Sequence, residues 1–116
     1  GGKEGDIRIV LKLPACLAPV KVAVFPLVGN KDNILAKAEE VFGGMKREID
    51  GVRLDDIGNI GKRYRRQDEI GTPWCVTVDY QTLEDGTVTV RDRDTMAQER
   101  VASDELIRYF QKKLEQ

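Results

Sequence analysis

The chain has 116 residues, of which 41% are hydrophobic and 34% charged, which fits one globular domain and excludes a disordered tail. It contains no histidine, and this excludes Ser-His-Asp and Cys-His nucleophile systems and histidine-ligated zinc sites. The net charge is −1 and the pI is about 5.5, so any contact with nucleic acid should be confined to a patch.

The first residues are predicted to lead into the domain. Residues 1–6 are glycine-rich and polar, and the apolar run 7–13 stops at Pro14. Extended segments punctuated by prolines usually arrive from something upstream. We therefore expect residues 1–13 to be a linker from an upstream part of a longer protein, and residues 14–116 to be the domain itself.

Neither a signal peptide nor a membrane span is visible in the sequence. No apolar run approaches the roughly 18 residues that a spanning helix needs. Cys16 and Cys75 form no CxxC pair, and reduced thiols are expected, with Cys75 buried in a strand. The prediction is a cytoplasmic protein without a membrane partner.

A strand and a helix come first in the domain. Residues 20–27 place apolar side chains on both faces, as a central strand covered by helices does. A helix with an apolar stripe is expected to start at residues 32–33, either of which could cap it. Gly43 and Gly44 interrupt the stripe and predict a weak or kinked last turn.

A short strand at residues 52–56 leads into a second helix, predicted for about residues 60–70. This helix holds four cations within five positions, and Gly71 and Pro73 end it. Its inner side should carry Ile60, Tyr64 and Gln67, and its outer side Lys62, Arg65, Arg66 and Glu69.

Three strands and a helix complete the chain. The strands are expected at residues 74–80, 87–91 and 98–102, and Ser103 should cap a helix that runs to about Leu114. The resulting order, βαβαβββα, predicts an α/β fold with a five-stranded mixed sheet flanked by three helices.

Catalytic chemistry has little support in the residues. Acid–base catalysis needs paired carboxylates in a cleft, and most aspartates here lie in turns. Asp92 and Asp94 lack the glycine and glutamate that complete a calcium loop. No glycine-rich phosphate motif is present. We therefore expect no catalytic residue, no metal site and no cofactor in this fragment.

The basic stretch allows two interpretations. Residues 58–61 open a helix whose free amides favour phosphate, and Tyr80 could stack on an unpaired base, as in single-stranded RNA binding. Alternatively, Arg65 and Glu69 form only a surface pair, and Tyr64 belongs to the core. The residues alone leave both interpretations open.

Three stretches closely resemble the C-terminal anticodon-binding domain of glycyl-tRNA synthetases of the homodimeric class II type. They are residues 17–27, 58–80 and 83–101, and the run GKRYRRQDEIGTP is the most specific part. The resemblance implies the same five-stranded fold and binding of the anticodon stem-loop of a glycine-accepting tRNA, not of DNA. ATP and magnesium would serve the missing catalytic domain of a homodimeric parent, and the fragment itself would be a monomer.

The resemblance also implies an RNA-binding set on the second helix, at the end of the third strand and across the hairpin. Its members are Lys62, Arg63, Arg66, Asp68, Glu69, Thr77, Asp79, Tyr80, Arg91 and Arg93. The rival hypothesis is a protein-interaction module of the same fold, as in a polymerase accessory subunit. A small carboxylate-dependent hydrolase is a third and weaker alternative.

Overall fold

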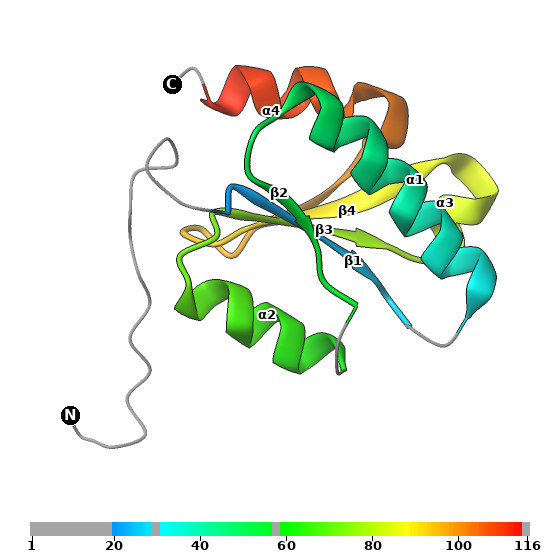
Figure 1. Cartoon of the computed structure of the whole chain (residues 1–116), viewed down its shortest axis with the longest axis horizontal. Helices are drawn as coiled ribbons and strands as arrows, with labels where there is room; N and C mark the ends of the chain where they lie inside the picture. Colours follow the sequence, from blue (N-terminus) through cyan, green and yellow to red (C-terminus); the bar gives the residue numbers. More distant parts are fainter. Residues whose placement is uncertain (1–19, 29–30, 57–58, 115–116) are drawn as a thin grey trace.

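The computed structural model describes residues 20–28, 31–56 and 59–114. They form an α/β domain in which one five-stranded sheet lies between two helical layers (Figure 1). The main helices are α1 (Asp32–Glu48), α2 (Ile60–Glu69) and α4 (Leu106–Leu114). The expected linker, Cys16 and Gly58 lie outside the described residues.

The sheet has the strand order β2-β1-β3-β4-β5. β1 pairs in parallel with β2 and β3, whereas β4 and β5 add an antiparallel hairpin. This confirms the mixed five-stranded sheet predicted from the sequence. The strands are β1 (Val22–Pro26), β2 (Val52–Leu54), β3 (Trp74–Val78), β4 (Thr87–Asp92) and β5 (Gln98–Ala102).

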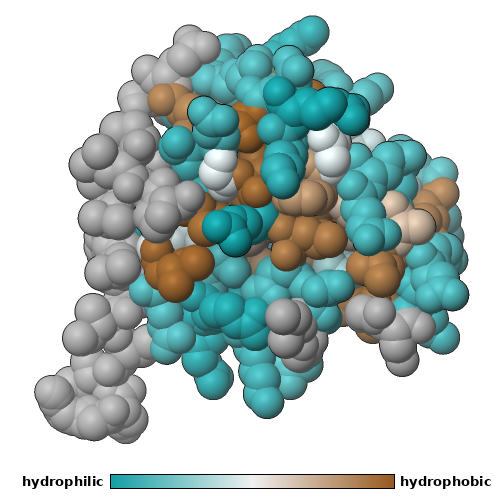
Figure 2. Space-filling view, in the orientation of Figure 1, coloured by the Kyte–Doolittle hydropathy of each residue, from teal (hydrophilic) through white to brown (hydrophobic). Residues whose placement is uncertain are grey.

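The main core lies between the sheet and the layer of α1 and α4. Valines of β1, β3 and β4 point toward this layer, where β-branched side chains suit the pleated surface. From the helices, Ile34, Leu106 and Phe110 reach them and are fully buried. Figure 2 shows hydrophilic residues over the outer helical surfaces and hydrophobic ones mainly in the band between the layers.

α1 differs from its sequence prediction at its two glycines and at its cap. The helix continues through Gly43 and Gly44 to Glu48, so the predicted interruption was wrong. Apart from the adjacent residues and the backbone of the helix itself, no described atom would lie within 4 Å of a Cβ at either glycine, so neither marks a close contact. The helix starts at Asp32 as predicted, but the predicted capping residue was wrong, because Lys31 occupies the N-cap position without a side-chain hydrogen bond to the helix.

A short helix, α3 (Tyr80–Asp85), replaces the predicted continuation of the third strand. Thr82 N–H donates to Asp79 Oδ1 at 3.1 Å, and Asp79 N–H donates to Thr82 Oγ1 at 3.0 Å. This reciprocal capping box starts a helix at Tyr80, where alternation predicted the last residue of the strand. Gly86, at φ 75°, ends it. The order among the described residues is therefore βαβαβαββα rather than βαβαβββα.

Other element ends shift by a few residues. β2 ends at Leu54 rather than at residue 56. Ser103 was expected to cap the last helix but starts a 3-10 turn, Ser103–Glu105, that precedes α4. Cys75 is buried in β3 as predicted, and burial raises the pKa of its thiol to about 12. Within the described parts of the chain, no helix is long and apolar enough to cross a membrane.

Candidate nucleic-acid interface

Among the described residues, α2 covers only part of the width of the sheet face turned toward it. Ile60 and Tyr64 of α2 pack against Ala23, Phe25 and Cys75, which belong to β1 and β3. On the same face, β4 carries Thr87, Thr89 and Arg91, and β5 carries their partners Ala102, Arg100 and Gln98, so this part of the face is mainly polar. We call this surface the polar strip, and it consists of Thr87, Thr89, Arg91 and Arg100.

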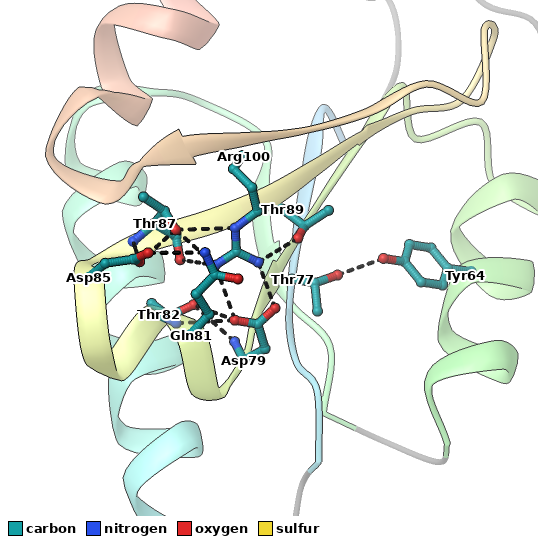
Figure 3. Close-up of polar contacts among 9 residues, drawn as sticks. All are labelled: Tyr64, Thr77, Asp79, Gln81, Thr82, Asp85, Thr87, Thr89 and Arg100. Carbon is teal, nitrogen blue, oxygen red and sulfur yellow. Dashed lines mark hydrogen bonds and ion pairs between the residues drawn. The ribbon is translucent and has the colours of Figure 1, made fainter.

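Arg100 binds the polar strip to the start of α3 (Figure 3). Its Nη1 donates to Asp79 Oδ2 at 2.8 Å and to Thr89 Oγ1 at 2.9 Å. Its Nε donates to Thr87 Oγ1 at 3.1 Å. Since Asp79 also caps α3, Arg100 fixes the place from which the next residue, Tyr80, projects.

Electrostatics keeps this contact charged at neutral pH. Burial raises the pKa of Asp79, but hydrogen bonds from Arg100 and Thr82 outweigh it, so the pKa lies below its ordinary value. The ion pair is partly exposed, with 30% of the Arg100 side chain accessible. Such a pair orients groups more than it stabilises the fold.

Several of the expected RNA-binding residues lie inside the fold. Arg63 is 2% exposed, and its Nη1 donates to the carbonyl of Pro26 at the end of β1. Burial lowers the pKa of the Arg63 guanidinium, while the charges of Asp55 and Asp56 oppose that shift. Arg63 therefore connects α2 to β1 and presents almost no surface to a ligand.

Arg93 and Arg66 also make internal contacts. Arg93 Nη1 donates to the carbonyl of Gly71 at 2.6 Å, and its side chain is 5% exposed. Arg66 Nη1 contacts both carboxylate oxygens of Asp55, at 2.6 and 2.7 Å, although 40% of its side chain remains accessible. Arg66, which was predicted to point outward, is thus partly exposed but also bound to Asp55.

A second group of expected residues gathers beneath α2. Tyr64 Oη lies 2.6 Å from Thr77 Oγ1, and the guanidinium of Arg91 sits 4.7 Å from the centre of the Tyr64 ring. Arg91 Nη1 is 3.6 Å from Asp68 Oδ1. Burial raises the pKa of Tyr64, with the Thr77 hydrogen bond opposing it. Thr77 and Asp68 therefore lie beside the polar strip and are joined to it through Tyr64 and Arg91.

The outer side of α2 carries the accessible charges. Lys62, Arg65 and Glu69 are exposed, and neither Lys62 nor Arg65 forms an ion pair with a described residue. Asn59 caps this helix by accepting from the amide of Lys62 at 2.9 Å. Tyr80 is 50% exposed at the start of α3. Cations and a ring thus lie where a ligand could reach them.

Two residues of this interface were absent from the predicted set. Arg65 belongs to the outer side by helical spacing, but no motif position selected it. Arg100 could have been found from strand alternation, because an antiparallel hairpin of residues 87–92 and 98–102 places it beside Thr89. Its bond to Asp79 spans 21 residues, and no local pattern reveals such a contact.

Comparison with known proteins supports an interface for RNA. A family model described as "Anticodon binding domain" matches residues 21–113. The chain belongs to this family. Anticodon-binding domains meet a single-stranded RNA loop, which proteins usually recognise through stacking and hydrogen bonds to splayed bases.

Relatives of this anticodon-binding domain are glycine–tRNA ligases from bacteria and archaea. The Corynebacterium glutamicum ligase is 57% identical over 109 residues, covering 94% of this chain and 23% of the relative. The Agathobacter rectalis ligase is 54% identical over 113 residues, covering 97% and 23%. The Methanothrix thermoacetophila ligase is 50% identical over 104 residues, covering 90% and 18%. The chain thus spans less than a quarter of these relatives.

Metal binding finds no support in the described parts of this anticodon-binding domain. They contain no group of three or more cysteine, histidine or acidic side chains placed to hold an ion. The interface is therefore best described by its hydrogen-bonding groups, cations and the Tyr80 ring.

Proposed function

We propose that this chain is the anticodon-reading domain of a glycine–tRNA ligase. The domain would comprise residues 14–116, and residues 1–13 would link it to a catalytic domain. Support comes from the family match over residues 21–113 and from ligase relatives that extend far beyond this chain. In the cytoplasmic, homodimeric parent, the catalytic domain would use ATP and magnesium to attach glycine, and this chain would take no part in that chemistry.

The observation that carries this proposal is the polar strip bordered by exposed cations. Among the described residues, the sheet face beside α2 carries the half-buried threonines Thr87 and Thr89 and the exposed residue Arg100, whose guanidinium bonds to their hydroxyl groups, while Arg91 is largely buried. Lys62 and Arg65 stand along α2 without carboxylate partners among the described residues. Bases of an anticodon loop would lie over the strip while its phosphates meet these cations.

The expected RNA-binding residues then divide by position. Lys62 would contact phosphate, Glu69 would accept from a base amino group, and Tyr80 would stack on a base. Arg91 would form the floor under the bases. The remaining members would hold the interface in shape from inside or from its edges; they are Arg63, Arg66, Asp68, Thr77, Asp79 and Arg93.

Titration with two anticodon stem-loops tests this function. One carries the glycine anticodon and the other is altered only at the middle anticodon base. Because one discriminating base contact is worth about 1–3 kcal/mol, we expect affinities that differ about tenfold or more. Equal affinity for both would reject anticodon reading and favour the protein-interaction module. Light scattering should give a mass near 13.1 kDa for the monomer.

A further inference from the structure

A second concave surface lies on the outer edge of β5, the last strand of the sheet. It is a groove of about 410 Å³ between β5 and α4. Residues 100–102 of β5 form one side, and Glu105, Arg108, Tyr109 and Lys112 form the other. Among the described residues β5 pairs only with β4, so its outer edge borders this groove.

The groove carries more positive charge than its neighbours neutralise. Arg108 and Lys112 are exposed, and neither has an ion-pair partner among the described residues. They stand four positions apart on one side of α4, where like charges repel each other. Glu105 is the one carboxylate among the lining residues. An anion in the groove would relieve this repulsion.

Arg100 connects the groove with the proposed RNA interface. It lines the groove, and its guanidinium bonds to Asp79, Thr87 and Thr89 on the polar strip. Lys62 and Arg65 on α2 therefore lie on the same side of the sheet as the strip, whereas Arg108 and Lys112 lie beyond the edge of β5, on α4, in the helical layer that covers the opposite face. A nucleic-acid backbone that crosses the strip would leave it around the edge of β5.

The solvent side of α1 shows a different arrangement. It carries charges of both signs, and Lys37 Nζ forms a 2.6 Å ion pair with Glu40 Oε2. Lys46 and Arg47 are exposed there, at the end of the helix and outside the groove. An excess of cations lining a groove is thus a feature of α4 and not of every helix.

We propose that the β5–α4 groove binds backbone phosphates of the same tRNA through Arg108 and Lys112. This inference rests on the proposed function, and it adds a contact outside the bases that are read. Phosphate contacts fix the position of an RNA without selecting its sequence. The groove would therefore contribute affinity and orientation, while base discrimination stays with the polar strip.

The test compares two double variants of the 116-residue chain. Arg108→Gln with Lys112→Gln removes the groove cations, and Lys46→Gln with Arg47→Gln removes two exposed cations from α1 at the same change in net charge. Each variant is titrated with the glycine anticodon stem-loop and the middle-base variant over a range of salt concentrations. Thermal unfolding checks that both remain folded.

For the groove variant we expect about tenfold weaker binding and a salt slope smaller by roughly 1.5, since each phosphate contact contributes about 0.7–0.9. Discrimination between the two stem-loops should not change, and the α1 variant should bind like the original chain. An unchanged salt slope in the groove variant, or equal losses in both variants, would overturn the groove proposal alone. Failure of the original chain to bind the glycine stem-loop would overturn both proposals.

Discussion

The two faces of the sheet are held by different forces. Toward α1 and α4, valines and large side chains such as Phe110 form a dry core. Toward α2, a small apolar cluster around Phe25 is joined by buried polar groups, including Arg63 and Gln67. Hydrophobic burial is non-directional, whereas hydrogen bonds require fixed partners at fixed angles.

This difference shows how the domain combines stability with a shaped interface. The apolar face can supply most of the folding free energy without fixing the position of any particular polar group. The polar face fixes α2 through contacts such as Gln67 Nε2 to Asp55 Oδ2 at 3.0 Å and Thr72 Oγ1 to Gln67 Oε1 at 2.7 Å. Fixed in this way, α2 presents Lys62 and Arg65 beside the polar strip.

The largest effect should come from the apolar face. Phe110→Ala removes a fully buried ring that lies 5.6 Å from the ring of Trp74. We expect the free energy of unfolding to fall by about 3–5 kcal/mol, because a cavity replaces packed surface. Urea denaturation measures this loss. Phe110→Leu, which keeps most of the volume, should lose clearly less, and equal losses would contradict the packing explanation.

An intermediate effect is expected inside the polar face. Arg63→Met removes the buried hydrogen bond to the Pro26 carbonyl and should cost about 1.5–3 kcal/mol of unfolding free energy. Arg65→Met, two positions along the same helix but exposed, should change stability by less than about 0.5 kcal/mol.

RNA titration completes the comparison of these two arginines. Arg65→Met should weaken binding of the glycine anticodon stem-loop. The main effect of Arg63→Met should be a loss of stability, not of RNA affinity in the folded protein. A stable Arg63→Met protein that no longer binds RNA would show that Arg63 contacts the ligand after all.

A smaller effect with a pH signature is expected at Asp79. Asp79→Asn keeps a side chain that can cap α3 but loses the ion pair with Arg100. We expect this loss to lower the free energy of unfolding by about 0.5–1 kcal/mol at pH 7. The pKa of Asp79 is lowered in the folded state, so its contribution is present above the unfolded value near 4 and disappears as pH falls below that.

Unfolding measured from pH 7 to pH 2 checks the Asp79 prediction. The original chain should lose stability below about pH 4, and Asp79→Asn should lose less over the same range. Hydrogen bonds from Thr87 and Gln81 lower the pKa of Asp85 to about 2, so some acid sensitivity should remain. Glu39→Gln, on the exposed side of α1, is the control. Parallel curves for the Asp79 variant and the original chain would refute a role for the ion pair.

The smallest effect on stability, with a clear effect on binding, is expected on the outer side of α2. Lys62→Gln with Arg65→Gln should leave unfolding within about 0.5 kcal/mol and reduce the salt slope of RNA binding by roughly 1.5. Lys62 and Arg65 have no ion-pair partners to lose among the described residues. Salt dependence equal to that of the original chain would remove α2 from the proposed interface.

The sequence alone determined the strands, the three long helices and the resemblance to an anticodon-binding domain. The strands and helices depend on local periodicity, and β5 was predicted with its observed bounds, residues 98–102, whereas the resemblance rests on motif residues such as the run GKRYRRQDEIGTP. The sequence prediction was wrong at Tyr80, because the alternating pattern predicted that the strand continues there, whereas the Asp79–Thr82 capping box starts a helix. Two local signals competed there, and side-chain hydrogen bonding to the backbone decided the outcome.

Only the tertiary structure decided what each cation does. Arg63 and Arg65 are the same residue type two positions apart, and they lie on opposite sides of α2. Helical spacing could have placed Arg63 on the same side of α2 as Ile60 and Gln67. A guanidinium is buried, however, only where a hydrogen-bond acceptor is available to it. That acceptor, the Pro26 carbonyl, lies 37 residues away in the chain, and the Arg100 partner Asp79 lies 21 away. Such distant contacts exist only once the sheet has brought the strand ends together.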